Sequence, residues 1–255
     1  MKAEKRKIAV LTAYSYAVAK IIDSAGIPLV IVGDSAGMVE AGLSTTLPVT
    51  VDEMVYHTKA VTRGRTNAFV VADMPFGSFQ VSIEEALRNA ARLVKEGGAE
   101  AVKVEGGRRS YETIKAIAGM DVPVMGHIGL TPQSVHRMGG YRVQGRDKAE
   151  AKEIIKDAKA VADAGAFSVV LEGIPASLAG EITEALTIPT IGIGAGPHCD
   201  GQVLVINDLL GLTAGSRTPK YVKRYADLDS IIREAVAEYI VDVQEGNFPD
   251  KEHSY

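Results

Sequence analysis

The chain has 255 residues, of which 46% are hydrophobic and 24% are charged, and its formal net charge is −4. This ordinary globular composition excludes a wholly disordered chain, a collagen and a disulfide scaffold. Without a basic excess, nucleic acid is not expected as a main partner. The single cysteine, Cys199, has no internal partner for a disulfide, which fits a reducing compartment.

One unit recurs along the chain: a helical segment, a glycine, a short apolar run and a polar residue. Eight such runs predict eight strands. Continuous β-branched runs indicate strands that are buried on both faces, as in a parallel sheet covered by helices. In chain order the runs are KIAVLTAY, SAGIPLVIVGD, AFVVADMP, EGGAEAVKVEG, VPVMGHIG, DAGAFSVVLEG, IPTIGIGAG and QVLVIND.

The segments between these runs are predicted to be helices. Thr50 and Ser82 each precede a glutamate by three residues, which is the pattern of a capping box at a helix start. A further helix is predicted from about residue 147, and a C-terminal helix over about 229–244. We expect this last helix to be the outermost one of the fold.

Eight βα units in a chain of this length predict an α/β fold, a single-domain (β/α)₈ TIM barrel over residues 1–255. A doubly wound open sheet is the competing interpretation. The apolar start of the chain is interrupted at Tyr14 and Ser15, so we expect no signal peptide. No apolar run is long enough to span a membrane, and we expect a cytoplasmic protein.

Ionisable residues follow one predicted strand after another, at the ends where the active site of a barrel lies. Charges inside apolar runs are costly to bury unless they are paired or bound to a metal. For any one of them, a structural ion pair or a solvent-facing strand end is an equally good interpretation. Six at equivalent positions favour an active site. They are Asp34, Asp73, Lys103, Glu105, His127 and Glu172.

Carboxylates without a cysteine cluster suggest a hard divalent cation, Mg²⁺ above all. Asp34 and Asp73 are candidate ligands, and Glu105 would bind directly or through water. Such a cation polarises a carbonyl, and a base then removes an adjacent proton to give a metal-stabilised enolate. Glu172 is a candidate for that base, and Lys103 for neutralising a substrate carboxylate. Spacing alone does not separate these roles.

Several motifs together resemble the ketopantoate hydroxymethyltransferase family of pantothenate and coenzyme A biosynthesis. The resemblance covers nearly the whole chain, and the motifs occur in the same order. It implies a (β/α)₈ barrel that requires Mg²⁺ and assembles as a homo-oligomer, commonly a decamer. An octamer is the alternative assembly. The motifs are VGDSAGMVEAGLSTTLPVTVDEMVYHTKAVTRG, VADMPFGS, AVKVEGG, GHIGLTPQS, GGYRVQGR, LEGIP, IPTIGIGAG and CDGQVLVINDLLGL.

The resemblance implies roles for individual residues in two groups. Asp34 and Asp73 match the metal-binding aspartates, which also contact the substrate, and Glu105 matches a third, more distant metal carboxylate. The residues that match the substrate side of the site are Ser35 and Lys103 for the oxo-acid carboxylate, Glu172 for the general base, and His127 as a residue lining the site.

The implied reaction transfers a hydroxymethyl group from 5,10-methylenetetrahydrofolate, or a related tetrahydropterin, to 3-methyl-2-oxobutanoate, giving 2-dehydropantoate. One alternative is another Mg²⁺-dependent, enolate-forming barrel enzyme, such as a lyase that cleaves 2-methyl or 2-hydroxy diacids. A reactive cysteine would support that lyase, but we interpret Cys199 as structural. A second alternative is a non-catalytic barrel that binds metabolites or serves assembly. The intact set of ionisable residues argues against it.

The sequence also gives a physical reason to expect an oligomer. One predicted helix carries more apolar residues than the narrow apolar stripe of a helix that packs on one side only. These residues are Val51, Met54, Val55 and Tyr56. A closed homo-oligomer is therefore expected, with small molecules as its other partners.

Overall fold

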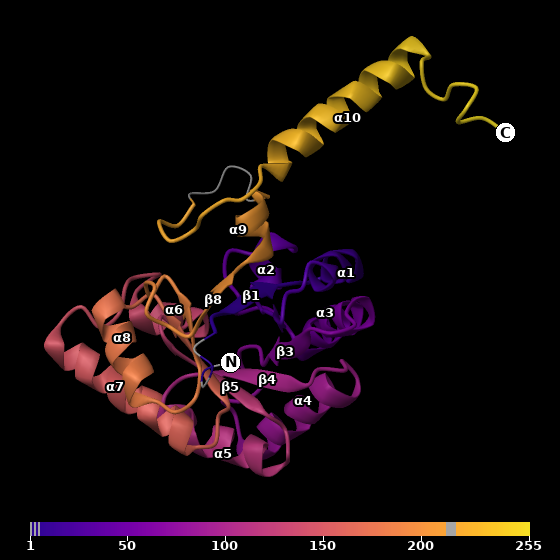
Figure 1. The fold of residues 1–255 in the computed structure, drawn as a ribbon. Helices are drawn as coiled ribbons and strands as arrows, with labels where there is room; N and C mark the ends of the chain where they lie inside the picture. The colour runs from indigo at the N-terminus through magenta and orange to yellow at the C-terminus, as the bar shows by residue number, and fades with distance from the viewer. Residues whose placement is uncertain (1, 3, 5, 213–217) are drawn as a thin grey trace. The chain divides into compact units, whose positions relative to one another are not determined.

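The computed structural model describes residues 2, 4, 6–212 and 218–255. Its described residues include eight parallel strands in a closed barrel, in which each strand pairs with the next and the last pairs with the first (Figure 1). The strands are β1 (Ile8–Thr12), β2 (Leu29–Val32), β3 (Phe69–Asp73), β4 (Ala101–Glu105), β5 (Val124–Gly129), β6 (Ser168–Glu172), β7 (Thr190–Ile193) and β8 (Gly201–Leu204).

The pairing of β1 with β8 closes the sheet, so the predicted (β/α)₈ TIM barrel of the α/β class is confirmed and the doubly wound open sheet is wrong. The helices between and after the strands are α1 (Tyr16–Ser24), α2 (Ala36–Val39), α3 (Val51–Gly64), α4 (Ile83–Lys95), α5 (Tyr111–Gly119), α6 (Val135–Met138), α7 (Lys148–Asp163), α8 (Ala176–Ala185), α9 (Ile206–Leu210) and α10 (Leu228–Glu245), with short 3₁₀ turns η1 (Arg108–Ser110) and η2 (Pro132–Ser134).

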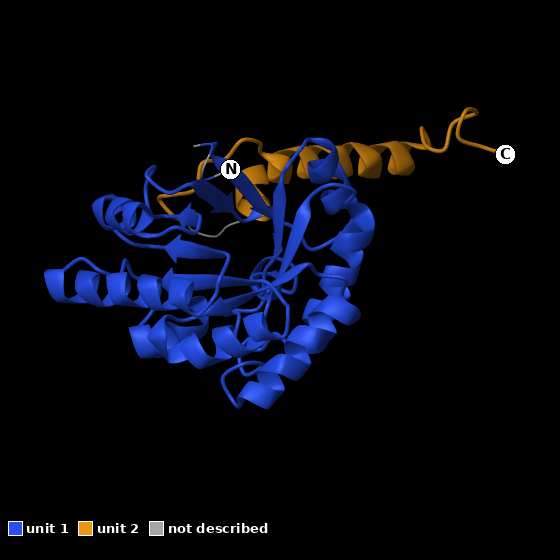
Figure 2. Ribbon diagram, turned by 60° about the horizontal axis from the view of Figure 1, so that its bottom comes forward, with its two compact units in different colours: residues 1–205 blue, residues 206–255 orange. Residues whose placement is uncertain are grey.

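The chain divides into two compact units, residues 1–205 and 206–255 (Figure 2). The first unit holds the whole barrel, and the second holds α9 and α10. The predicted C-terminal helix is present as α10, and none of its eighteen residues, all of which are described, is buried. Its place as the outermost helix of one domain over residues 1–255 stays a prediction. Among the described residues, no helix combines the length and apolarity that crossing a bilayer requires.

The barrel interior is filled by apolar side chains from all eight strands. Residues two apart on a strand share a face. The interior rows therefore continue from Val71 to Asp73, from Ala101 to Lys103 and then Glu105, and likewise on β5 and β6. A charged layer thus lies on top of the apolar layer, at the C-terminal ends of the strands. The apolar layer includes Val10, Ile31, Val71, Ala101, Met125, Val170, Ile191 and Val203.

The predicted helix starts are formed by side-chain caps. Thr50 and Glu53 make a reciprocal capping box, in which each side chain accepts a hydrogen bond from the other residue's backbone N–H. Ser82 Oγ accepts from the backbone N–H of Glu85, which is one half of the predicted box. Asp147 caps α7 by accepting from two backbone N–H groups of its first turn.

Most of the apolar residues of α3 that the sequence suggested as an oligomer contact pack inside the first unit. Met54 and Val55 are buried, so their reading as surplus apolar surface is wrong, because α3 packs against α1, β2 and β3. Val51 is half-buried, and Tyr56, which is 71% exposed, is the one residue of the four that stays on the surface.

Helix α7 approaches strand β5 closely at Gly126. A Cβ atom there would lie 2.3 Å from Cγ1 of Val161, which is fully buried. Valine in a helix has one strongly preferred χ1 rotamer, so Val161 cannot turn away. We predict that Gly126→Ala lowers the free energy of unfolding by about 1–3 kcal/mol, as overpacking of a core does, measured by urea denaturation.

Gly119→Ala, at the C-terminal end of α5, is the matched control. A Cβ atom there has no other atom within 4 Å, so we expect no loss of stability. Adding Val161→Ala to Gly126→Ala removes the clash. The double variant should therefore lose less than the sum of the two single losses. A Gly126→Ala protein as stable as the wild type contradicts the close packing of α7 on β5.

Candidate active site

The structure brings the predicted ionisable residues together at the C-terminal rim of the barrel. Strand register places Asp73 of β3 beside Lys103 of β4, and Glu105 of β4 beside His127 of β5. Glu172 ends β6, the neighbour of β5. Asp34 follows the end of β2. All but Glu172 are buried, and the Glu172 side chain keeps 14% of its surface exposed.

Lys103 lies at the centre of these carboxylates. Its Nζ is 3.1 Å from Asp73 Oδ2 and 3.2 Å from His127 Nδ1. Burial alone favours a neutral amine, but the charges of Asp73, Glu105 and Asp34 outweigh burial and raise the pKa of Lys103. The ammonium is therefore held charged in the interior, where it can pair with an anion.

The aspartates of β2 and β3 are linked to each other. The backbone N–H of Asp34 donates to Asp73 Oδ2 at 3.1 Å. Burial, with the negative charges of Asp73 and Glu105, raises the pKa of Asp34 to about 8. Burial also raises the pKa of Asp73. Even beside the Lys103 ammonium, the two carboxylates therefore take up protons more readily than exposed aspartates do, and a further positive charge would oppose this.

His127 connects two glutamates. Its Nδ1 is 3.5 Å from Glu105 Oε1, and its Nε2 is 3.0 Å from Glu172 Oε2. Burial and the Lys103 ammonium disfavour the imidazolium, but the two glutamates prevail and raise the pKa of His127 to about 9. Burial would raise the pKa of Glu105, yet His127 and Lys103 lower it. His127 thus lies against Glu172, which is the one carboxylate of this group whose side chain is partly exposed.

Ser35 lies over Gly33, next to the aspartates. A Cβ atom on Gly33 would be 2.6 Å from Ser35 Oγ, so a side chain there would displace the Ser35 hydroxyl. The Ser35 hydroxyl shares a 2.8 Å hydrogen bond with the hydroxyl of buried Tyr14. Sequence reasoning missed Tyr14, because a tyrosine just beyond a strand end is also common in a packed core.

Gln133 is the second residue that sequence reasoning missed. Its side-chain Nε2 donates to Asp34 Oδ2 at 2.8 Å, and its backbone N–H donates to Glu105 Oε2 at 3.1 Å. A neutral amide in a polar segment after a strand carries no charge signal. The quoted motif GHIGLTPQS contains it, but nothing in the sequence distinguishes it from a loop residue.

The predicted metal ligands fit a hard cation that retains water. Asp73 Oδ1 is buried and has no hydrogen-bond partner within the described part of the chain. In that same part, no three His, Cys, Asp or Glu side chains are arranged to hold a metal ion by themselves. Mg²⁺ binds through one or two carboxylates and completes its shell with water and substrate oxygens. Asp34 and Asp73 match this requirement, and Glu105 lies behind them, held by His127 and Gln133.

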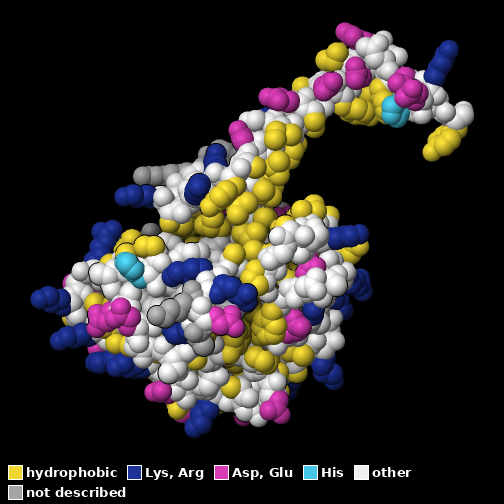
Figure 3. Space-filling model, in the orientation of Figure 1, with side chains coloured by type: hydrophobic (Ala, Val, Ile, Leu, Met, Phe, Trp, Pro, Cys, Tyr) yellow, Lys and Arg dark blue, Asp and Glu magenta, His cyan; other side chains and the backbone are white. Residues whose placement is uncertain are grey.

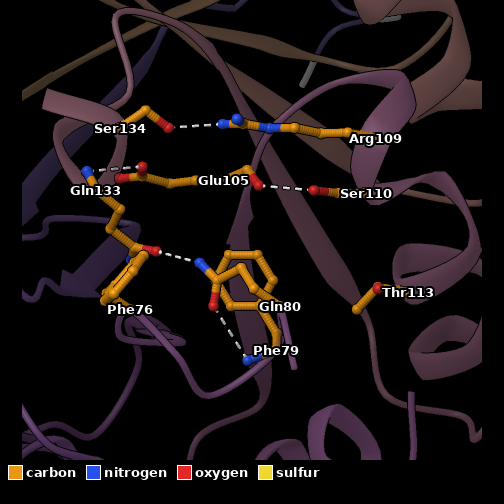
Figure 4. A pocket seen from close by; sticks show the side chains of 9 residues that line it. All are labelled: Phe76, Phe79, Gln80, Glu105, Arg109, Ser110, Thr113, Gln133 and Ser134. Atoms are coloured by element: carbon orange, nitrogen blue, oxygen red, sulfur yellow. Dashed lines mark hydrogen bonds between the residues drawn. The ribbon is translucent and has the colours of Figure 1, made fainter. Parts of the chain in front are cut away.

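A cavity of about 280 Å³ adjoins this group (Figure 4). Glu105 and Gln133 line one side, and Phe76 and Phe79 of the segment after β3 line another. Arg109, which donates to Ser134 Oγ, lies along a further side. The cavity therefore shares a wall with the carboxylate group.

Cys199 does not have the environment of a reactive thiol. It is a free cysteine that is fully buried, and burial raises its pKa. Reactive cysteines are partly exposed and have a lowered pKa. The structural interpretation of Cys199 is consistent with this, and the lyase alternative loses the feature that would favour it.

Sequence comparisons identify close relatives. The model of the family described as Ketopantoate hydroxymethyltransferase matches residues 1–251. A Syntrophotalea carbinolica protein named 3-methyl-2-oxobutanoate hydroxymethyltransferase is 63% identical over 255 residues, which are 100% of this chain and 95% of that protein. A Geobacter sulfurreducens protein of the same name is 61% identical with the same coverage.

Solved structures with little sequence identity share the barrel. 2,3-Dimethylmalate lyase, a member of the PEP mutase/isocitrate lyase superfamily, is 15% identical with a TM-score of 0.60, over 98% of this chain and 87% of its own. A phosphonopyruvate hydrolase complex with oxalate and Mg²⁺ is 12% identical with a TM-score of 0.59, over 98% and 89%. At these identities the likeness extends to the fold alone.

The position of Lys103 leads to a stability prediction. Lys103→Met keeps an unbranched side chain but leaves buried carboxylates without their ammonium. We predict a loss of about 3–5 kcal/mol in the free energy of unfolding at pH 7, measured by urea denaturation, because an unpaired buried charge is costly. Adding Asp73→Asn should restore part of the loss.

Lys156→Met provides the control, since Lys156 pairs with Glu153 on the exposed surface of α7. Exposed pairs contribute about 0–1 kcal/mol, so this variant should stay close to the wild type. If Lys103→Met also stays close to the wild type, the ammonium does not stabilise the buried carboxylates.

Proposed function

Since the chain belongs to the ketopantoate hydroxymethyltransferase family, we propose that it transfers a hydroxymethyl group from 5,10-methylenetetrahydrofolate, or a related tetrahydropterin, to 3-methyl-2-oxobutanoate. The product is 2-dehydropantoate, for pantothenate and coenzyme A biosynthesis. One observation carries this proposal: a buried ammonium, paired carboxylates and a carboxylate–imidazole pair meet at the barrel rim. These groups can bind the carboxylate of a 2-oxo acid and remove a proton from the carbon next to its keto group.

The oxo acid would be bound through its carboxylate. The Lys103 ammonium supplies the opposite charge in a buried setting, where a charge-assisted hydrogen bond is strong. The Ser35 hydroxyl, positioned by Tyr14, supplies a further hydrogen bond. Asp34 and Asp73 would hold Mg²⁺ beside this carboxylate. When bound, the cation would polarise the keto oxygen and make the neighbouring C–H bond more acidic.

Glu172 would act as the general base. It is the partly exposed carboxylate of the group, and one of its oxygens lies 3.0 Å from Nε2 of His127. Its other oxygen is available to take the proton from C3 of the oxo acid. Water would add to the methylene bridge of the donor, so that both of its C–N bonds break and the one-carbon unit leaves tetrahydrofolate as formaldehyde. The carbon nucleophile formed at C3 would attack the carbonyl carbon of formaldehyde, and the resulting alkoxide would take up a proton to give the hydroxymethyl group.

Assembly as a closed homo-oligomer, most simply a decamer or an octamer, is part of the proposal. Support comes from α10, whose exposed apolar side chains recur at helical spacing and form a stripe along the helix (Figure 3). Exposed apolar surface of this kind marks interaction sites. The members of the stripe are Ile232, Val236, Tyr239, Ile240 and Val243.

The cytoplasm is the compartment that we propose. Cys199 is a free thiol, which is the usual state of cysteine in a reducing environment. The proposed substrates are small soluble molecules, so neither nucleic acid nor a membrane is required as a partner.

The role of Glu172 can be tested without the one-carbon donor. Deuterium uptake from D₂O into C3 of 3-methyl-2-oxobutanoate, followed by NMR, reports proton removal alone. We predict that Glu172→Gln slows this exchange by about 10²- to 10⁴-fold, the usual contribution of a positioned base. Glu181→Gln, at an exposed position on α8, should exchange at the wild-type rate. Unchanged exchange in Glu172→Gln assigns the base to another residue.

The metal requirement can be tested by removing the cation. We predict that a chelator abolishes turnover and that added Mg²⁺ restores it. Asp73→Asn removes a hard anionic ligand, so it should raise the Mg²⁺ concentration needed for half-maximal activity. Asp163→Asn, at an exposed position of α7, should not change that concentration. Full turnover in the presence of chelator contradicts the role proposed for Asp34 and Asp73.

The assembly can be tested by light scattering at micromolar protein concentration. We predict a mass of eight to ten subunits, whereas a mass near the 27.0 kDa of one chain refutes the proposal. Val236→Lys places a charge in the apolar stripe of α10 and should lower the mass. Glu234→Lys, on the opposite side of the helix, is the control and should leave it unchanged.

A further inference from the structure

Gln133 is a buried amide between the predicted metal ligands. It lies in η2, directly after the end of β5, and only 6% of its surface is exposed. Figure 4 shows its backbone nitrogen directed at Glu105 and its amide directed at Gln80. Nothing in the proposed chemistry uses it directly.

Every hydrogen-bonding atom of the Gln133 side chain has a partner. Nε2 donates to Asp34 Oδ2 at 2.8 Å and to the carbonyl oxygen of Met74 at 2.9 Å. Oε1 accepts from Gln80 Nε2 at 3.0 Å. The carbonyl oxygen of Met74 can only accept, so the nitrogen and oxygen of the amide cannot be exchanged. The side chain is therefore held in one orientation.

Gln80 fixes Gln133 from behind. The Oε1 atom of Gln80 accepts from the backbone N–H of Gly77 at 2.8 Å, which ties its amide to the segment after β3. The Gln80–Gln133 pair thus connects the ends of β2, β3, β4 and β5. This pair supports the aspartates through neutral amide groups. We call it the amide support.

The amide support determines which aspartate oxygens are available. Gln133 occupies Oδ2 of Asp34, and the hydrogen bonds of Asp73 also fall on its Oδ2, from the Asp34 N–H and from Lys103. Within the described residues, Oδ1 of each aspartate accepts no hydrogen bond. An amide also orients a carboxylate without adding positive charge that would repel a cation.

We propose that Gln133 is a positioning residue that sets the affinity of this site for its divalent cation. Its amide holds Asp34 with Oδ1 free, and its backbone N–H holds Glu105 behind the pair. Groups that orient metal ligands in this way typically contribute a factor of 10 to 100 in metal affinity. The inference rests on the proposed function, because the cation belongs to that proposal.

The test is an equilibrium titration with Mn²⁺, in which electron paramagnetic resonance measures the free ion, so that binding is read independently of turnover. Gln133→Met keeps the length of the side chain but removes the amide. We expect its Kd for Mn²⁺ to rise about 10- to 100-fold. The Mg²⁺ concentration for half-maximal activity should rise similarly, while kcat at saturating Mg²⁺ changes much less. Gln202→Met, an exposed position on β8, should bind like the wild type.

A second variant keeps the test decisive if Gln133→Met folds poorly. Gln80→Met leaves Gln133 and both aspartates intact but removes the hydrogen bond to Gln133 Oε1, so the amide is held less firmly and we expect a Kd about 2- to 10-fold higher. Wild-type Kd values in both variants overturn the inference, even if their urea midpoints fall, because Gln133 is then merely structural. Wild-type protein that binds no Mn²⁺ contradicts the proposed function itself, and the inference falls with it.

Discussion

The ion pair between Lys103 and Asp73 is the interaction on which the rim of this barrel depends. Burial favours the protonated form of interior carboxylates, as the raised pKa values of Asp34 and Asp73 show, and a neighbouring positive charge opposes this shift. Lys103 supplies that charge at 3.1 Å from Asp73. The amine therefore favours the anionic form of Asp73, and the surrounding carboxylates in turn hold the amine charged. A substrate carboxylate and a divalent cation would enter a site in which both signs of charge are already in place.

The barrel makes this arrangement possible by its alternation of faces. Interior positions two residues apart carry an apolar side chain below and a charged one above, as in Val71 and Asp73 of β3. The apolar layer closes the bottom of the site to water, which strengthens the interactions above it. Neutral groups complete the rim: Tyr14 orients Ser35, and Gln133 orients Asp34 and Glu105. Charge and orientation are thus supplied by different residues.

The sequence predicts the charged part of this site and misses the neutral part, for a physical reason. Asp73, Lys103 and Glu172 stand out because a charge in an apolar strand needs an explanation. Gln133 and Tyr14 do not, since amides and phenols occur equally in loops and in cores. The barrel itself is predictable from eight similar units. Burial on α3 is not, because Met54 and Val55 face partners that are distant in sequence.

The central claim is that the charged rim carries out one-carbon transfer to a 2-oxo acid. The most direct test incubates the protein and Mg²⁺ with 3-methyl-2-oxobutanoate and 5,10-methylenetetrahydrofolate labelled with ¹³C at the methylene carbon. The account predicts that ¹³C NMR shows the label in the hydroxymethyl group of 2-dehydropantoate. A label that stays on the donor, together with cleavage of a 2-methyl or 2-hydroxy diacid by the same protein, would contradict it.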